Sequence, residues 1–308
     1  MSRPSAEAVS RVAVIGTGVV GASWAAYFLA HGMDVAASDP APGAEERLRA
    51  FIARARPDLR QLGLTGDGRL SFHAEAERAV ADAEFVQENA PEREELKRDL
   101  LARLDRAAPP GVIIASSTSS LLRSRMVRDC PTPARIIIAH PFNPPHLVPL
   151  VELVGEDQPA VQWAAAFYRA IGKRPIILKR EATGHIANRL TAALWREALY
   201  ILEQGIGEVE DIDAAVAYGP GLRWAHMGPF MTYHLGGGPG GIQYYMDHLG
   251  PSQVRRWQDL GTPAVNEELT RRAVEGVARE AAGRSIEELE RERDRALIRL
   301  QRALGEPA

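Results

Sequence analysis

The chain has 308 residues, of which 45% are hydrophobic and 25% charged, and this length and composition are typical of a globular protein with two domains. The 37 Lys and Arg residues nearly balance the 40 Asp and Glu residues, which argues against binding to nucleic acid or to a membrane surface and favours a small-molecule partner. A single cysteine, Cys130, excludes an internal disulfide framework and a Cys-based metal cluster and suits a reducing, cytoplasmic environment.

The first part of the chain is predicted to alternate strands and helices. Residues 1–10 are short and polar, and glycines interrupt the apolar run that follows, so we expect neither a signal peptide nor a membrane span. The expected strands are 11–15, 34–38, 83–87, 112–115, 136–139 and 175–179, and the expected helices are 22–30, 42–56 and 92–104. This alternation predicts an α/β fold of the Rossmann type, with a doubly wound, mostly parallel sheet.

Strand-like runs disappear after about residue 183. Helices are expected at 187–204, 209–218, 267–279 and 285–304. We therefore expect a Rossmann domain over residues 1–183 and a smaller all-helical domain over residues 184–308.

The last predicted helix has a capping box and an apolar stripe. Ser285 and Glu288 have the spacing of a capping box. The stripe consists of Ile286, Leu289, Leu297, Leu300 and Leu304. Such a stripe must be buried, either within its own domain or in a contact with another subunit.

A glycine turn follows the first predicted strand and precedes the first predicted helix. The GxGxxG pattern alone is also found in protein kinases, but the chain has no His-Arg-Asp or Asp-Phe-Gly segment. The strand-to-helix setting is typical of dinucleotide binding. There Gly16 allows the tight turn, Gly18 lets the backbone approach the pyrophosphate, and Gly21 lets helix and strand pack closely. The amides of Val19 and Val20 then face the phosphate charge.

Asp39 lies at the end of the second predicted strand, 18 residues after Gly21. An acid at this position accepts hydrogen bonds from the adenosine ribose hydroxyls. It would also repel a 2′-phosphate, and the following Pro40 and Ala41 offer no arginine to bind one. The cofactor is therefore predicted to be NAD rather than NADP. The alternative is a structural turn followed by a solvated aspartate.

His140 is the candidate catalytic base. It follows the predicted strand 136–139 at its carboxyl end, where open α/β sheets bind their ligands. Oxidation of an alcohol needs a base for the hydroxyl proton while the hydride leaves, and histidine titrates near neutral pH. His146 lies six residues further on, but no third ligand stands at a metal-binding spacing, so no metal site is predicted.

Glu152 is an isolated acid in the apolar run of residues 147–154. Burying a carboxylate is costly unless it is paired, and a histidine base needs a partner that fixes its tautomer. Glu152 therefore either orients His140 or faces solvent on a half-exposed strand.

Four segments in order resemble the signature of the L-3-hydroxyacyl-CoA dehydrogenase family. They are Ser116–Leu121, Ala139–Pro145, Leu150–Val154 and Gly184–Leu190, and the resemblance extends from about Arg11 to Leu235. It implies an NAD-dependent dehydrogenase that acts on a 3-hydroxyl group and forms a homodimer through its helical domain.

The resemblance also implies roles for single residues. His140 is the base and Glu152 is hydrogen-bonded to it. Ser119 and Asn188 hold the substrate oxygen and the ring geometry. Glu92 and Lys97 approach the ribose and nicotinamide side of the cofactor. Without the resemblance, Ser119 would be interpreted as part of a serine-rich loop and Lys97 as part of a solvated helix face.

The segment His-Pro-Phe-Asn-Pro-Pro differs from the His-Phe-Phe-Asn-Pro of the acyl-CoA enzymes and resembles a branch with L-carnitine dehydrogenases and lambda-crystallin. Segments 16–24, 39–43, 219–230 and 232–237 resemble the carnitine dehydrogenases, whereas the part after about Ser252 matches poorly. The implied reaction is oxidation of L-carnitine to 3-dehydrocarnitine. The alternatives are a 3-hydroxyacyl-CoA dehydrogenase, an L-gulonate 3-dehydrogenase, and a crystallin-like NAD-binding protein without catalysis.

The chemistry of carnitine is compatible with the residues of the helical part. Aromatic faces bind a quaternary ammonium, although aromatic residues at helical spacing also build cores. The candidates are Trp195, Tyr200, Trp224, Phe230, Tyr233, Tyr244 and Tyr245. A substrate carboxylate would need an arginine, for which Arg196 and Arg223 are candidates.

Overall fold

The structure, a computed structural model, describes residues 4–304. The chain divides into two compact units. The α/β unit consists of the chain up to Arg189 together with the segment from Asp294 onward, and the helical unit is Leu190–Arg293.

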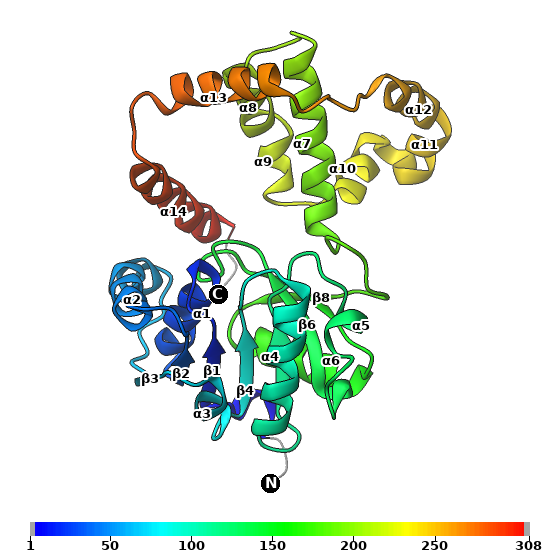
Figure 1. Cartoon of the computed structure of the whole chain (residues 1–308). Helices are drawn as coiled ribbons and strands as arrows, with labels where there is room; N and C mark the ends of the chain where they lie inside the picture. The colour runs from blue at the N-terminus through cyan, green and yellow to red at the C-terminus, as the bar shows by residue number, and fades with distance from the viewer. Residues whose placement is uncertain (1–3, 305–308) are drawn as a thin grey trace. The chain divides into compact units, whose positions relative to one another are not determined.

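The α/β unit is built on a sheet of eight strands in the order β3-β2-β1-β4-β5-β6-β7-β8 (Figure 1). The strands are β1 Arg11–Ile15, β2 Asp34–Ser38, β3 Leu70–His73, β4 Phe85–Glu88, β5 Ile113–Ser116, β6 Ile136–Pro141, β7 Leu150–Val154 and β8 Arg174–Ile177. All neighbouring pairs are parallel except β6 and β7. The predicted Rossmann-type sheet is confirmed.

Three details of the sheet differ from the sequence prediction, and one of them is the antiparallel strand β7, which was not among the expected strands. The edge strand β3 was not expected, because its residues are only partly buried and lack a strong apolar pattern. The strand β6 continues two residues beyond Ala139, because its end pairs with the antiparallel strand β7. His140 therefore lies inside the end of β6 rather than after it.

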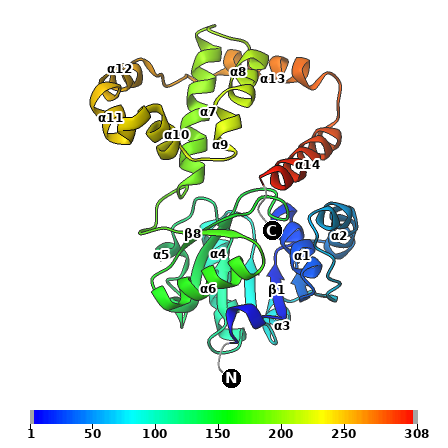
Figure 2. The same cartoon turned by 180° about the vertical axis from the view of Figure 1, so that it is seen from behind.

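Helices cover both faces of the sheet, as expected for a doubly wound fold (Figures 1 and 2). Their bounds are α1 Val19–Ala30, α2 Ala44–Gln61, α3 Ala76–Val80, α4 Glu94–Ala107, α5 Arg123–Met126 and α6 Gln158–Ala170. One core joins α1, α2 and α6 to the sheet, with Trp24 stacked on Phe28 at 5.2 Å between ring centroids. A second core joins α3, α4 and α5 to the sheet through residues such as Leu101 and Met126.

The remaining helices belong wholly or partly to the helical unit. They are α7 Ala187–Glu203, α8 Val209–Tyr218, α9 Pro220–Trp224, α10 Pro229–Gly236, α11 Gly241–His248, α12 Gly250–Asp259, α13 Glu267–Ala281 and α14 Ile286–Ala303. The first residues of α7 and the last turns of α14 belong to the α/β unit. Within the helical unit, Leu202, Val209 and Leu269 form a small buried cluster.

The helix α14 begins with the predicted capping box. The Ser285 amide donates to the Glu288 carboxylate at 2.8 Å, and the Glu288 amide donates to the Ser285 hydroxyl at 3.2 Å. The predicted apolar stripe is largely uncovered in the single chain, since Ile286 is 75% exposed and Leu300 is 44% exposed. The buried apolar residue of this helix is Ile298, which the stripe did not include.

Among residues 4–304, no helix has the length and apolar character needed to cross a membrane. The same residues contain no group of three or more His, Cys, Asp or Glu side chains arranged to hold a metal ion.

Candidate active site

The glycine turn joins β1 to α1. Gly16 has a φ of 82°, and a Cβ at this position would lie 2.7 Å from the Asn89 carbonyl oxygen. A Cβ on Gly21 would lie 1.8 Å from the Gly16 carbonyl oxygen. In contrast, nothing lies within 4 Å of a Cβ built on Gly18. The fold itself therefore requires glycine at 16 and 21, whereas Gly18 faces open space in which a ligand fits.

This open space suits a dinucleotide phosphate. Gly18 is the N-cap of α1, which begins at Val19. The amides of Val19 and Val20 are in the first turn, where N–H groups have no acceptor within the helix and the helix dipole favours an anion. The residues present thus fit the pyrophosphate of NAD.

Asp39 lies just after β2, beside the glycine turn. One carboxylate oxygen accepts from the Thr17 amide at 2.7 Å and from the Thr17 hydroxyl at 3.2 Å. The other accepts from the Ala41 amide at 2.9 Å. These bonds hold the carboxylate at the end of β2, the position from which an acid reaches the adenosine ribose.

His140 and Glu152 face each other across the antiparallel pair β6 and β7. The His140 Nδ1 lies 2.9 Å from the Glu152 Oε2, and the side chains are 7% and 1% exposed. Because an ionised carboxylate only accepts, the ring proton lies on Nδ1 and leaves Nε2 as a base. Glu152 is therefore buried against His140 and does not face solvent.

A second set of hydrogen bonds fixes Glu152. Its Oε1 accepts from the Ile186 amide at 2.8 Å and from the Ala187 amide at 3.0 Å. Burial raises the pKa of Glu152, but the hydrogen bonds from His140 and from these two amides outweigh burial and lower the pKa overall. The carboxylate thus stays ionised beside His140.

Glu92 anchors the loop that carries Ser119. Its Oε1 accepts from the Thr118 hydroxyl at 2.7 Å, from the Ser119 amide at 2.9 Å and from the Ser120 amide at 2.8 Å. Burial raises the pKa of Glu92, but the hydrogen bonds from Thr118 and Ser120 and the charge of Lys97 lower it overall. Glu92 and Ser119 are thus neighbours, although 27 residues separate them.

Lys97 is buried rather than solvated. Its Nζ lies 2.8 and 3.0 Å from the two carboxylate oxygens of Glu88, and the side chains are 1% and 0% exposed. The Ser116 hydroxyl also donates to Glu88. Sequence reasoning missed Glu88, although an acid at the end of a buried strand was a usable signal.

One cavity of about 360 Å³ in the α/β unit brings together half of the predicted site residues, but not the glycines of the turn, Val19 or Asp39. Its lining consists of Val20, Asn89, Ala90, Glu92, Lys97, Ser117, Ser119, His140, Pro141, Phe142, Asn143 and Asn188. Glu152 is not in the lining, because it lies behind His140. The cavity therefore joins the start of α1 to the predicted base and to both predicted substrate-orienting residues.

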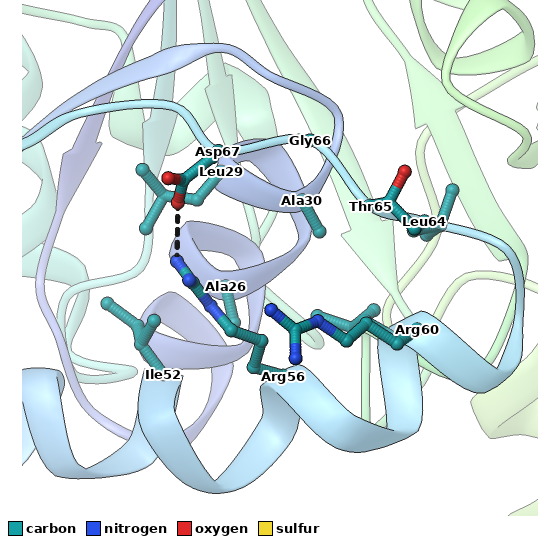
Figure 3. A pocket seen from close by; sticks show the side chains of 11 residues that line it. Ala26, Leu29, Ala30, Ile52, Arg56, Arg60, Leu64, Thr65, Gly66 and Asp67 are labelled. Carbon is teal, nitrogen blue, oxygen red and sulfur yellow. Dashed lines mark hydrogen bonds and ion pairs between the residues drawn. The ribbon is translucent and has the colours of Figure 1, made fainter.

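A second hollow of about 200 Å³ lies between α1, α2 and the loop that follows α2 (Figure 3). Its two arginines come from α2, and Arg56 is closed onto Asp67 by a 2.9 Å ion pair. None of the predicted site residues lines it. The cavity at His140 is therefore the candidate active site.

Two family models together match the described chain from residue 11 to residue 280, apart from residue 183. The NAD binding domain of 3-hydroxyacyl-CoA dehydrogenase matches residues 11–182, and the C-terminal domain of the same family matches residues 184–280. The chain belongs to the 3-hydroxyacyl-CoA dehydrogenase family. The predicted family and its NAD cofactor are confirmed, and this family member is an NAD-dependent oxidoreductase acting on a CH–OH group.

Several curated relatives are similar over nearly their full length. L-carnitine dehydrogenase of Streptomyces griseus is 52% identical over 305 residues, covering 97% of this chain and 91% of the relative. L-carnitine dehydrogenase of Pseudomonas aeruginosa is 46% identical over 304 residues, covering 97% and 95%.

Several solved structures share the fold. An NAD⁺-dependent 5-formyl-3-hydroxy-2-methylpyridine 4-carboxylic acid 5-dehydrogenase has a TM-score of 0.80 at 29% identity, covering 97% of this chain and 100% of that one. The 3-hydroxybutyryl-CoA dehydrogenase of Escherichia coli has a TM-score of 0.63 at 31% identity, covering 74% of this chain and 49% of that one.

Proposed function

We propose that this chain oxidises L-carnitine to 3-dehydrocarnitine, with NAD as the hydride acceptor. The observation that carries the proposal is the 43–52% identity to L-carnitine dehydrogenases over nearly the full chain. The buried pair of His140 and Glu152 at the cavity supports the same chemistry, because it supplies a positioned base for an alcohol.

In the proposed reaction, His140 Nε2 takes the proton of the substrate 3-hydroxyl, and the ketone forms as the carbon–hydrogen electron pair leaves. Bound NAD supplies the acceptor for that hydride. Glu152 holds the Nδ1 proton and stabilises the positive charge that His140 acquires. Ser119 and Asn188, which line the same cavity, orient the substrate oxygen.

We assign cofactor binding to the glycine turn and its neighbours. Gly16, Gly18 and Gly21 shape the turn, Val19 and Val20 donate amides to the pyrophosphate, and Asp39 binds the adenosine ribose. Two further residues belong to the nicotinamide side. They are Glu92 and Lys97, which line the cavity.

The helical unit offers groups for the two charged ends of carnitine. Several of its aromatic side chains are accessible in the single chain, with Trp195 60% exposed and Trp224 45% exposed. Tyr245 is only 7% exposed and serves the core instead. We assign the quaternary ammonium to an accessible aromatic face, and the carboxylate to Arg196 or Arg223, which are both exposed.

We further propose a cytoplasmic homodimer that assembles through the helical unit, with residues 1–183 serving the cofactor and residues 184–308 serving substrate and dimerisation. Leu190 is 58% exposed and Leu194 is 40% exposed on the same face of α7, and neighbouring exposed apolar side chains mark a contact surface. Sedimentation equilibrium should give twice the 33.6 kDa chain mass, and a 33.6 kDa species alone would contradict the dimer.

The substrate assignment is tested by a panel of L-carnitine, D-carnitine, L-gulonate and 3-hydroxybutyryl-CoA, with NADH formation as the readout. We expect kcat/KM for L-carnitine to exceed the other values by about 10²-fold or more, because a site built for one polar pattern rejects analogues that leave its groups unpaired. NADP in place of NAD is the cofactor control. Turnover of gulonate or the acyl-CoA without turnover of L-carnitine would refute the assignment.

A further inference from the structure

His185 occupies an unusual place next to the catalytic pair. It has a φ of 50°, one of two positive values among the non-glycine residues of the described chain, and it follows Gly184 with a φ of 75°. A left-handed residue with a side chain costs of order 1 kcal/mol or more and persists only where its surroundings hold it. His185 is also 1% exposed, so those surroundings are protein.

The ring of His185 has one partner and one free nitrogen. Its Nε2 lies 3.1 Å from the Thr118 carbonyl oxygen. A carbonyl only accepts, so Nε2 carries the proton and donates it. The buried Nδ1 has no hydrogen-bond partner among the described residues. The ring centroid lies 5.1 Å from that of His140.

The backbone that follows His185 donates hydrogen bonds to the catalytic pair. The next two amides, of Ile186 and Ala187, both donate to Glu152, which in turn holds His140. The carbonyl that accepts from His185 belongs to Thr118, which directly precedes Ser119. The His185 side chain therefore ties the Ser119 loop to the turn that fixes Glu152.

We propose that His185 is a positioning residue for the base, whose Nε2–H bond to Thr118 locks the left-handed turn that presents two amides to Glu152. This inference deepens the proposed function, because it concerns the same site.

The charge state of His185 agrees with this role. Burial lowers its pKa and the charge of His140 lowers it further, whereas the bond to Thr118 and the charges of Glu152 and Glu92 act in the opposite direction, and the net effect is a lowered pKa. A neutral ring adds no positive charge beside His140 at the moment when His140 takes up the substrate proton.

Three variants separate the hydrogen bond from the backbone conformation. His185→Gln places an amide N–H near the position of Nε2. His185→Asn tolerates the left-handed region well but has a shorter side chain that does not reach the carbonyl. His185→Phe keeps the ring without any donor. NADH binding by fluorescence titration serves as the folding control, since the glycine turn lies elsewhere in the α/β unit.

We expect His185→Phe and His185→Asn to lose about 10²-fold in kcat with KM for NAD unchanged, because misplacing a catalytic group by about 1 Å has such an effect. His185→Gln should recover most of kcat. Wild-type kcat in the Phe or Asn variant, or a Gln variant as slow as the Asn variant, would overturn the proposal. The rates are measured with whichever panel substrate the wild type oxidises, so failure with carnitine alone leaves the comparison intact.

A second measurement needs no substrate. The ¹⁵N shifts of the His185 ring should show a neutral ring with the proton on Nε2 at neutral pH. A proton on Nδ1, or a doubly protonated ring, would overturn the proposal even if a variant failed to fold.

Discussion

At the scale of single residues, the hydrogen bonds of the site determine which ring nitrogen of His140 carries a proton. Glu152 accepts from the His140 ring at 2.9 Å and from two backbone amides at about the same distance, so the proton of His140 is fixed on Nδ1. The free Nε2 is then available to a substrate hydroxyl. The proposed role of His140 as the base therefore depends on the charge and acceptor capacity of Glu152.

Replacing Glu152 by Gln tests this dependence. The amide can donate to His140 and so favour the wrong tautomer, and it cannot stabilise the imidazolium. We expect kcat to fall by about 10²-fold to 10⁴-fold, the range for loss of general base catalysis, with little change in NADH affinity. Glu156→Gln is the matched control, because the Glu156 side chain is 73% exposed and lines no part of the cavity. Equal kcat in both variants would refute the role of Glu152.

A histidine outside the site sets a pH dependence of stability. Burial and the charge of Lys173 lower the pKa of His31 from 6.5 to about 4. Its Nε2 is buried and has no hydrogen-bond partner in the part of the chain that the structure describes. Between these two pKa values the unfolded state binds more protons than the folded state, so stability is lost as the pH falls from 6.5 towards 4.

We expect the free energy of unfolding in urea to decrease between about pH 7 and pH 5. The decrease should be smaller in His31→Gln, because glutamine does not titrate. The comparison of variant and wild type isolates His31 from the other acid-sensitive groups. An identical decrease in both proteins would show that His31 does not contribute.

At the scale of elements, the glycine turn combines a requirement of the fold with a requirement of the ligand. Gly21 has no room for a Cβ, since the Gly16 carbonyl oxygen would lie 1.8 Å away. Gly18 has open space at the same position. Substitution by alanine is therefore expected to lower stability at Gly21 and to affect cofactor binding, but not stability, at Gly18.

Gly21→Ala should lower the free energy of unfolding by about 1–3 kcal/mol, the usual range for overpacking, because backbone must move. Gly18→Ala should change stability by less than about 0.5 kcal/mol. It should nevertheless weaken NADH binding, because the methyl group enters the space assigned to the pyrophosphate. Urea unfolding and fluorescence titration measure the two effects. Unchanged NADH affinity in Gly18→Ala would refute the assignment of the turn.

The sequence was sufficient to predict the elements whose signal is local. A β-branched strand before glycines predicted β1 and α1, and an apolar run predicted β6 up to Ala139. The strand β3 was missed because an edge strand needs no continuous apolar pattern. The extension of β6 was missed because it depends on pairing with β7.

In the candidate site, too, most residues with a local signal were predicted and residues that depend on tertiary contacts were missed. His140 and Glu152 were predicted from an isolated polar residue at each strand, together with the family resemblance. Glu88 was missed although an acid at the end of a buried strand was a usable signal, whereas His185 was missed because its contact with Thr118 joins residues 67 positions apart. The left-handed φ of His185 could not be predicted either, because the hydrophobic periodicity of a sequence carries no information about the backbone conformation of a single histidine.

At the scale of the whole molecule, the chain contains both domains of the 3-hydroxyacyl-CoA dehydrogenase family, and we assign the proposed cofactor turn and the proposed base to the first of them. The α/β unit contains the glycine turn, the His140 cavity and the Glu152 network. The helical unit has a small core and many accessible aromatic side chains, which suit substrate binding and subunit contact. We therefore expect hydride transfer from carbon 3 of L-carnitine to NAD.

The most direct test uses L-carnitine deuterated at carbon 3. With wild-type protein and NAD, we predict that the deuterium appears in the reduced nicotinamide, detected by mass spectrometry of the isolated cofactor, and that 3-dehydrocarnitine forms in equal amount. Reduced cofactor without deuterium, or no reduction of NAD by L-carnitine, would contradict the account.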